Sequence, residues 1–294
     1  MLVGFTCRKG GSGVTTVTLS VAKILEKHKV KCCLVDLKNN GDYDKILNIN
    51  SRQSNLDYLL TDYLYNDNQT EITKSIFHLS DYLDVVPGTR VKVQGYLYRK
   101  ADGLKEFLDQ LEDHYDIVFL DARDDQLLSK LIELGTHIYK VHVLDQNMLV
   151  TSLYQDVMQE DNLIGKLIVN KIDNDIYPSE DIFVSMFRNK KILFLPYSKD
   201  INSIINETIR NKGQFASKIL VSVPEFYKPL VKFSEELYKT AKEYNEKHGT
   251  NSSESEDDFV NFLMQRTDEI RKDESKNRPV KKKKKGLFNF FSRG

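Results

Sequence analysis

The sequence is poor in cysteine, and this absence limits the classes of protein to which it can belong. Its three cysteines are Cys7, Cys32 and Cys33. An adjacent pair and one distant residue make a poor disulfide framework, and they provide no zinc-binding spacing. All three lie in apolar runs that predict β-strands, so we expect buried, reduced thiols. The cysteines therefore argue against a disulfide-stapled or zinc-stabilised protein.

Long apolar stretches are missing as well. No run reaches the roughly 18 apolar residues that a membrane-spanning helix needs. Residues 1–7 have neither the basic start nor the apolar stretch of a secretory signal. We therefore expect a cytoplasmic protein.

Charge is balanced over the whole chain but unevenly distributed. Residues 281–294 contain six basic residues and no acidic one, so residues 1–280 carry a net charge of −6. An acidic body argues against a protein that coats nucleic acid with its whole surface. The distribution favours a domain that is held to an anionic surface by one end.

Short apolar runs alternate with longer helical patterns along the first part of the chain. The runs that predict strands are Leu2–Cys7, Cys32–Val35, Leu83–Val86, Ile117–Leu120, Ile138–Leu144, Leu167–Val169 and Ile192–Leu195. The stretches that predict helices are Thr16–Lys27, Leu56–Leu64, Gly103–His114, Leu127–Leu134, Val150–Glu160 and Phe226–Tyr244. This alternation predicts an α/β fold, with a mostly parallel, doubly wound sheet covered on both faces. Ligands of such sheets bind at the carboxyl ends of the strands.

The composition divides the chain into three parts. We assign residues 1–245 to the α/β domain. Residues 246–280 are polar and rich in serine and acidic side chains, which predicts a mostly disordered linker with a possible short helix at 259–271. Residues 281–294 form a separate basic and aromatic tail.

A glycine-rich loop connects the first predicted strand to the first predicted helix. Its residues are Lys9, Gly10, Gly11, Ser12, Gly13, Val14, Thr15 and Thr16. Three glycines permit a tight turn with inward N–H groups, and the following helix adds its positive N-terminal end. Together these features suit a di- or triphosphate. The Thr15 hydroxyl stands where it would hold Mg²⁺. The alternative is a ligand-free turn in which the glycines serve packing.

Residues 9–16, KGGSGVTT, resemble the deviant Walker A motif KGGVGKTT of the MinD/ParA family of ATPases. Four further segments resemble motifs of that family in the expected order, across about residues 1–245. They are Leu34–Asp36 at the switch I entrance, Tyr115–Asp121 as the Walker B strand, Gly165–Lys171 at the adenine contact and Leu195–Tyr197 at the base-packing loop. The resemblance implies a P-loop NTPase fold and ATP or ADP with Mg²⁺ as cofactor.

The family's functional residues carry over onto matching positions. Binding residues would be those of the loop together with Asn170, which would read the adenine edge, and Pro196. Thr15 and Asp121 would hold the Mg²⁺ ion. Lys9 would reach across a homodimer to the partner's nucleotide. If the protein is active, Lys9, Asp36 and Asp121 would be catalytic.

Departures from the family pattern concern hydrolysis more than binding. Val14 replaces the lysine that contacts the β- and γ-phosphates, and Lys38 stands where switch I has a second aspartate. Removing one preorganised electrostatic donor typically lowers a rate by ~10²–10³. Backbone N–H groups survive the change at Val14. We therefore predict weak or moderate nucleotide binding with weak or absent ATP hydrolysis.

Three of these residues have plainer interpretations. Asp121 could cap the turn after its strand, and Asn170 could be an ordinary turn residue. For Lys38 we favour a solvated loop lysine, over an ammonium that has moved into the space left by Val14 to contact phosphate.

The tail combines a basic run with an aromatic face. Residues Lys281, Lys282, Lys283, Lys284 and Lys285 precede Leu287, Phe288, Phe290 and Phe291. At 100° per residue the four apolar side chains fall within an arc of about 160°. This pattern predicts a short amphipathic helix that lies on an anionic membrane. It resembles the membrane-targeting sequence of MinD-type members of the family. A solubilising tail or a nucleic-acid patch needs no such aromatic cluster.

The sequence thus predicts a membrane-tethered nucleotide-binding organiser, peripherally associated with the inner face of the cell membrane. The expected partners are the anionic membrane surface, a second copy of the chain and a protein client of unknown identity. An active membrane-cycling ATPase is one alternative, and a ParA-like DNA-partition protein is another. DNA is not expected as a partner because residues 1–280 are acidic.

Overall fold

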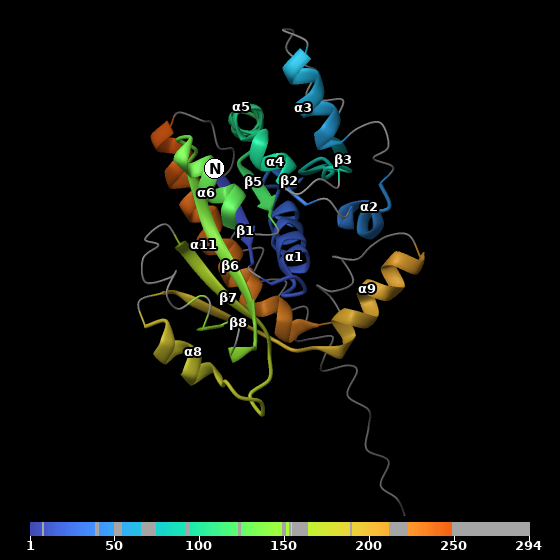
Figure 1. Ribbon diagram of the computed structural model, residues 1–294. Coiled ribbons are helices and arrows are strands. Elements are labelled where there is room, and N and C mark those ends of the chain that lie inside the picture. Colours follow the sequence, from blue (N-terminus) through green and yellow to red (C-terminus); the bar gives the residue numbers. More distant parts are fainter. Residues whose placement is uncertain are drawn as a thin grey trace, which may run out of the picture. The chain divides into compact units, whose positions relative to one another are not determined.

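A twisted sheet of eight strands forms the centre of the described structure, in the order β3-β4-β2-β5-β1-β6-β7-β8 (Figure 1). The computed structural model describes residues 1–248, except for residues 8, 39–40, 50–54, 66–74, 92–94, 123–124, 149–150, 153, 155–163, 189 and 212–222. The strands are β1 (Leu2–Thr6), β2 (Cys32–Asp36), β3 (Phe77–Ser80), β4 (Leu83–Val86), β5 (Ile117–Asp121), β6 (Ile138–Asp145), β7 (Ile164–Ile172) and β8 (Ile192–Pro196).

All neighbouring strands run parallel except β3, which pairs with β4 in the antiparallel direction. The strand order changes direction beside β1, because the chain fills one side of the sheet through β5 and then crosses to β6, β7 and β8. Asp121 at the end of β5 is in register with Phe5 of β1 and Asp36 of β2. This register brings two carboxylates to adjacent carboxyl ends of the sheet, where ligands of such folds bind.

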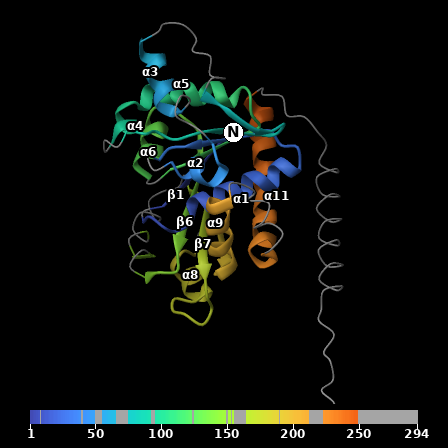
Figure 2. The same cartoon turned by 90° about the vertical axis from the view of Figure 1, so that its right-hand side faces the viewer.

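Helices cover both faces of the sheet (Figure 2). They are α1 (Val14–Lys27), α2 (Asp42–Leu47), α3 (Leu56–Tyr65), α4 (Tyr96–Arg99), α5 (Ala101–Glu112), α6 (Asp125–Glu133), α8 (Glu180–Met186), α9 (Lys199–Asn211) and α11 (Pro224–His248). Helices α1 and α11 pack together on one face, while α3, α4, α5 and α6 cover the other.

Alternating side chains of the strands divide the core between these two faces. On the α11 face, the ring of Phe5 lies 6.0 Å from that of Phe119 and 6.3 Å from that of Phe233. Leu2, Val118 and Val35 point to the opposite face, where they join the apolar side chains of α3, α5 and α6. The strands are buried on both faces, which is why their sequences are nearly continuous apolar runs.

The fold class predicted from the sequence is confirmed. Each of the seven predicted strands is present, and the predicted burial of three unpaired cysteines is confirmed. Strand β3 was missed because its side chains are only partly buried at the sheet edge, so it has no apolar run. Helix α11 ends at His248, three residues beyond the domain end that we expected.

Several predictions fall outside the described residues. These are the linker from residue 249 onward, the short helix at 259–271, the tail at 281–294 and most of the helix expected over Val150–Glu160. Within the described part of the chain, no helix combines the length and apolar character needed to cross a membrane.

Removing the ring of Phe233 should test whether α11 is an integral part of the core. Phe233 is 1% exposed and contacts both Phe5 and the ammonium of Lys166, which lies 5.6 Å from its ring centroid. We expect Phe233→Ala to lower the free energy of unfolding by about 3–5 kcal/mol, measured by urea denaturation. Val184→Ala, at a side chain that is 51% exposed on α8, is the control. Equal effects of the two substitutions would contradict this packing.

Candidate functional site

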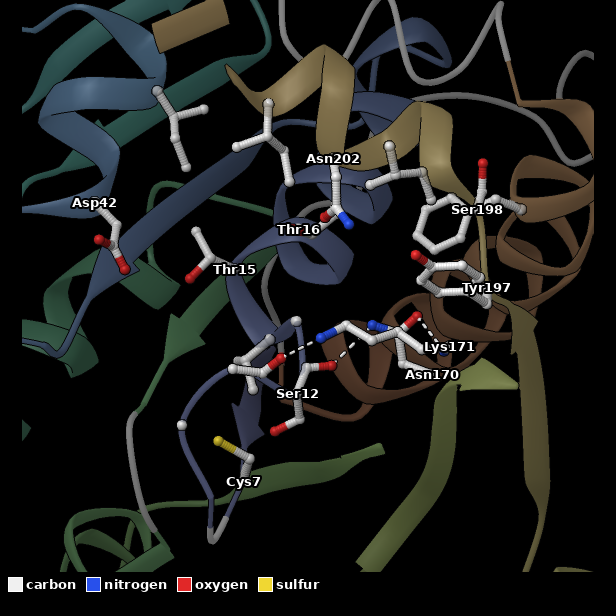
Figure 3. A pocket seen from close by; sticks show the side chains of 18 of the residues that line it. Cys7, Ser12, Thr15, Thr16, Asp42, Asn170, Lys171, Tyr197, Ser198 and Asn202 are labelled. Carbon is white, nitrogen blue, oxygen red and sulfur yellow. Dashed lines mark hydrogen bonds between the residues drawn. The ribbon is translucent and has the colours of Figure 1, made fainter. Parts of the chain in front are cut away.

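A cavity of about 560 Å³ opens at the carboxyl ends of the strands, beside β1 (Figure 3). The predicted nucleotide-binding residues Gly10–Thr16, Asn170 and Pro196 all line it. The structure therefore brings together three segments that lie far apart in the sequence. A volume of this size is typical of small-ligand sites.

The glycine-rich loop enters the cavity between β1 and α1. Gly11 has a φ angle of 90° and Gly13 one of 93°, both in the left-handed region that favours glycine. At Gly13, a Cβ atom would lie 2.3 Å from Asn170 Nδ2. The loop is stabilised internally by the Ser12 hydroxyl, which donates a hydrogen bond to the Lys9 carbonyl at 2.7 Å. Gly13 is thus required both by the backbone angle and by the close approach of β7.

Two residues of β7 hold the loop from the other side. Asn170 Nδ2 donates to the Ser12 carbonyl at 2.8 Å, and Lys171 Nζ donates to the Gly11 carbonyl at 2.5 Å (Figure 3). Asn170 Oδ1 accepts a hydrogen bond from the Lys171 backbone N–H at 2.9 Å. Asn170 is 4% exposed, so its amide is an internal contact between loop and sheet. The expected adenine contact of Asn170 stays a prediction.

Lys9 lies apart from the other loop residues. It is not among the side chains that line the cavity, and its own side chain is 52% exposed. Its ammonium lies 3.8 Å from Asp145 Oδ2 at the end of β6. Within a single chain, Lys9 therefore does not contribute to the lining of the predicted phosphate site.

Lys38 makes the most unexpected contacts of the site. Its ammonium donates hydrogen bonds to Thr15 Oγ1 and, at 2.6 Å, to Asp121 Oδ2. It lies 3.6 Å from Asp42 Oδ2 and 3.9 Å from Asp36 Oδ1. The Lys38 side chain is only 8% exposed. The solvated loop lysine that we favoured from the sequence is therefore wrong.

Charges around this lysine shift several pKa values. Burial alone would lower the pKa of the Lys38 ammonium, but Asp121 and Asp36 outweigh burial and raise it, so the group stays protonated. Burial raises the pKa of Asp36 well above its usual range, with Lys38 opposing that shift. Tyr43 is fully buried, and its ring centroid lies 5.5 Å from Lys38 Nζ. Burial, with Asp121 and Asp36, raises the pKa of the Tyr43 hydroxyl.

The residues expected to hold Mg²⁺ are the same ones that hold this ammonium. Mg²⁺ takes oxygen ligands at about 2.0–2.1 Å in near-octahedral geometry. Thr15 Oγ1 and Asp121 Oδ2 both contact Lys38 Nζ instead. Among the described residues, no group of three or more acidic, histidine or cysteine side chains is placed to hold a metal ion. As arranged, Thr15 and Asp121 do not fit a magnesium ion.

The far wall of the cavity is more apolar and comes from α2, β8, α9 and α11. Helices α2 and α9 contact each other, and both contribute lining residues. Sequence reasoning identified Pro196 and the base-packing loop of this wall, but it missed the contribution of helices α2 and α9, which were not predicted. Its lining side chains are Ile46, Pro196, Tyr197, Ile201, Ile205 and Phe226. Such a wall suits the planar base of a nucleotide, next to the polar loop that suits its phosphates.

Comparisons with known proteins were made at the level of family, sequence and fold. Residues 2–134 match the family model of the AAA domain. Among curated protein sequences, none matches the chain.

Solved structures with the same fold include MinD and ParA proteins. The MinC:MinD cell division complex of Aquifex aeolicus matches with a TM-score of 0.62 at 15% identity, covering 81% of this chain and 96% of that one. A ParA family ATPase from Chlorobium tepidum matches with 0.63 at 17% identity, covering 79% and 98%. The MinD protein of Pyrococcus horikoshii, complexed with Mg-ADP, matches with 0.61 at 19% identity, covering 82% and 98%. The predicted resemblance is confirmed, and these likenesses establish the fold.

Substitution of Gly13 should disrupt the contact between the loop and β7. Gly13→Ala would place a methyl group against the Asn170 amide at a strained φ angle. We expect a loss of about 1–3 kcal/mol in unfolding free energy, together with faster amide exchange in the loop. Gly10→Ala is the matched control, since a Cβ there meets nothing within 4 Å. Equal stability of the two variants would contradict this role of Gly13.

Proposed function

We propose that this protein, which has the fold of the MinD/ParA P-loop ATPases, is a nucleotide-binding organiser that is tethered to a membrane and hydrolyses ATP weakly or not at all. Nucleotide binding is supported above all by the convergence of Gly10–Thr16, Asn170 and Pro196 on one cavity. Membrane tethering is supported by the sequence of residues 281–294.

Support for nucleotide binding comes from the two walls of the cavity. The loop precedes the N-terminus of α1, so backbone N–H groups and the helix dipole favour an anion there. Lys38, Lys45 and Lys171 also line the cavity, with Asp42 as the acidic side chain among the lining residues. The apolar wall of α9 and α11 would take the base. These features suit ATP or ADP.

Weak hydrolysis is supported by what surrounds the predicted phosphate position. Val14 is 7% exposed and supplies no charge to the cavity that it lines. Asp121 is neutralised by Lys38. Phosphoryl transfer depends on positioned positive charge and an oriented nucleophile. We therefore expect the nucleotide to bind through the backbone of the loop, while its hydrolysis is weak or absent.

Membrane attachment would be peripheral and reversible. Each lysine near an anionic leaflet contributes ~1 kcal/mol, and each buried apolar side chain contributes at most ~1.5–3 kcal/mol. One tail of five lysines, one leucine and three phenylalanines gives modest affinity. Two tails in a homodimer would bind with greater avidity. The exposed side chain of Lys9 is consistent with a contact to a second copy. Such a dimer would position a protein client at the inner face of the cell membrane.

Nucleotide binding and hydrolysis can be separated experimentally. We expect a fluorescent ATP analogue to bind the wild-type protein and to bind Gly13→Ala about tenfold more weakly, because the loop is distorted. Phosphate release with anionic vesicles should not exceed that of Asp121→Ala. Lys130→Met on α6, away from the cavity, is the control. Turnover well above that of Asp121→Ala would instead favour the active membrane-cycling ATPase.

The tail should determine membrane binding. In flotation with anionic vesicles, we expect the full-length protein to float and a variant lacking 281–294 to remain at the bottom. Phe288→Ser/Phe290→Ser/Phe291→Ser should float much less, because it keeps the charge and loses the insertion. Neutral vesicles provide the control for charge. Flotation of the truncated protein would refute the assignment, and salt-sensitive DNA retardation by that protein would favour the DNA-partition alternative.

A further inference from the structure

The Lys38 side chain lines the cavity together with the residues of the glycine-rich loop. Thr15 comes from the loop and first turn of α1, Asp121 from the end of β5, and Lys38 itself follows β2. Its ammonium hydrogen-bonds both Thr15 Oγ1 and Asp121 Oδ2. A hydroxyl and a carboxylate converging on one point make a cation site, and here the cation belongs to the chain.

The backbone fixes the position from which this side chain starts. The Leu37 N–H donates to the Asp121 carbonyl at 3.0 Å, and the Lys38 N–H donates to Asp36 Oδ1 at 3.0 Å. Gly88 packs against the same turn, where a Cβ atom would lie 2.3 Å from the Lys38 carbonyl oxygen and 2.9 Å from Asp36 Cγ. The ammonium is therefore preorganised from β2, β5 and the segment after β4.

The ammonium retains a donor for a ligand. It has three N–H groups, and among the described residues its hydrogen bonds go to Thr15 and Asp121. Asp42 and Asp36 lie beyond hydrogen-bond distance, at 3.6 and 3.9 Å. Lys38 also lines the same cavity as Gly10–Thr16, which leaves the remaining donor for a ligand bound at the loop.

We infer that Lys38 is a built-in replacement for the divalent metal ion, so that this site binds nucleotide phosphates without Mg²⁺. The claim that the site holds nucleotide phosphates rests on the proposed nucleotide binding. The claim that Lys38 takes the place of the metal ion rests on the Lys38 contacts alone. A single positive charge takes the place of two, so phosphates are held less strongly and charge developing in a transition state is stabilised less. The replacement thus favours binding over turnover.

The first test compares nucleotide binding by the wild-type protein in Mg²⁺ and in excess EDTA. We expect the dissociation constant of a fluorescent ATP analogue to change by less than about threefold, because no metal ion takes part. Lys38→Ala should bind the analogue about tenfold more weakly in EDTA and should regain affinity in Mg²⁺, because Thr15 and Asp121 are then free to ligate the ion. Lys130→Met is the control and should behave as wild type.

The second test needs no nucleotide. Lys38→Ala leaves the buried Asp121 carboxylate without its counter-charge, so Mg²⁺ should raise its melting temperature. The melting temperature of the wild type should not respond to Mg²⁺. The double variant Lys38→Met/Asp121→Asn removes the positive charge of Lys38 and the negative charge of Asp121. It should fold, and its melting temperature should not respond to Mg²⁺. It keeps the comparison informative if Lys38→Ala fails to fold.

Two results would overturn the inference. One is wild-type nucleotide binding that is lost in EDTA, and the other is a wild-type melting temperature that rises with Mg²⁺ as much as that of Lys38→Ala. If the analogue binds in neither condition, the proposed nucleotide binding fails, while the melting comparison still decides the role of Lys38.

Discussion

The buried ion pair between Lys38 and Asp121 is the interaction on which the arrangement of the site depends. At 2.6 Å, with both side chains at most 8% exposed, it joins the end of β2 to the end of β5. A pair of this kind gains little net stability, because its desolvation cost is close to its Coulomb energy. Instead, the ion pair fixes the end of β2 relative to the end of β5. Asp36 and Asp121 are in register on neighbouring strands, and they would repel one another without a cation between the strand ends and the loop.

The parallel sheet explains why a lysine after β2 can reach this position. Parallel strands end together at one edge, so the residue two positions beyond β2 reaches the groups at the end of β5 and the start of α1. Tyr43 and Gly88 complete the surroundings, one by its ring and the other by having no side chain. A glycine that is required by close approach and an aromatic ring beside an ammonium both favour one fixed position of the lysine. The geometry therefore follows from the fold as well as from the local sequence.

Much of this organisation was predictable from residue patterns. Apolar runs identified the parallel strands, since strands buried on both faces carry a continuous signal. Gly10–Thr16 identified the loop, because three glycines followed by two threonines between a strand and a helix form the pattern of a phosphate-binding turn. The partly exposed edge strand β3 and the six-residue helix α2 gave no such signal, whereas the isoleucines of the 13-residue helix α9 recur at helical spacing and were overlooked. The position of Lys38 was inaccessible for a different reason: Thr15 is 23 residues away and Asp121 is 83 residues away, so only the tertiary structure brings them together.

The charge balance of the site links its geometry to its function. In the family that the sequence resembles, a loop lysine and a divalent ion together face the phosphates. Here Val14 removes the first charge, and Lys38 takes the place expected for the second. The backbone of the loop is retained. Asn170 and Lys171 hold it by donating hydrogen bonds to its carbonyl groups. The backbone N–H groups of the loop can hold a phosphate, but phosphoryl transfer also depends on positioned positive charge and an oriented nucleophile. A site with these contacts is suited to holding a nucleotide as a structural ligand. The basic, aromatic tail would then attach the nucleotide-bound protein to the membrane.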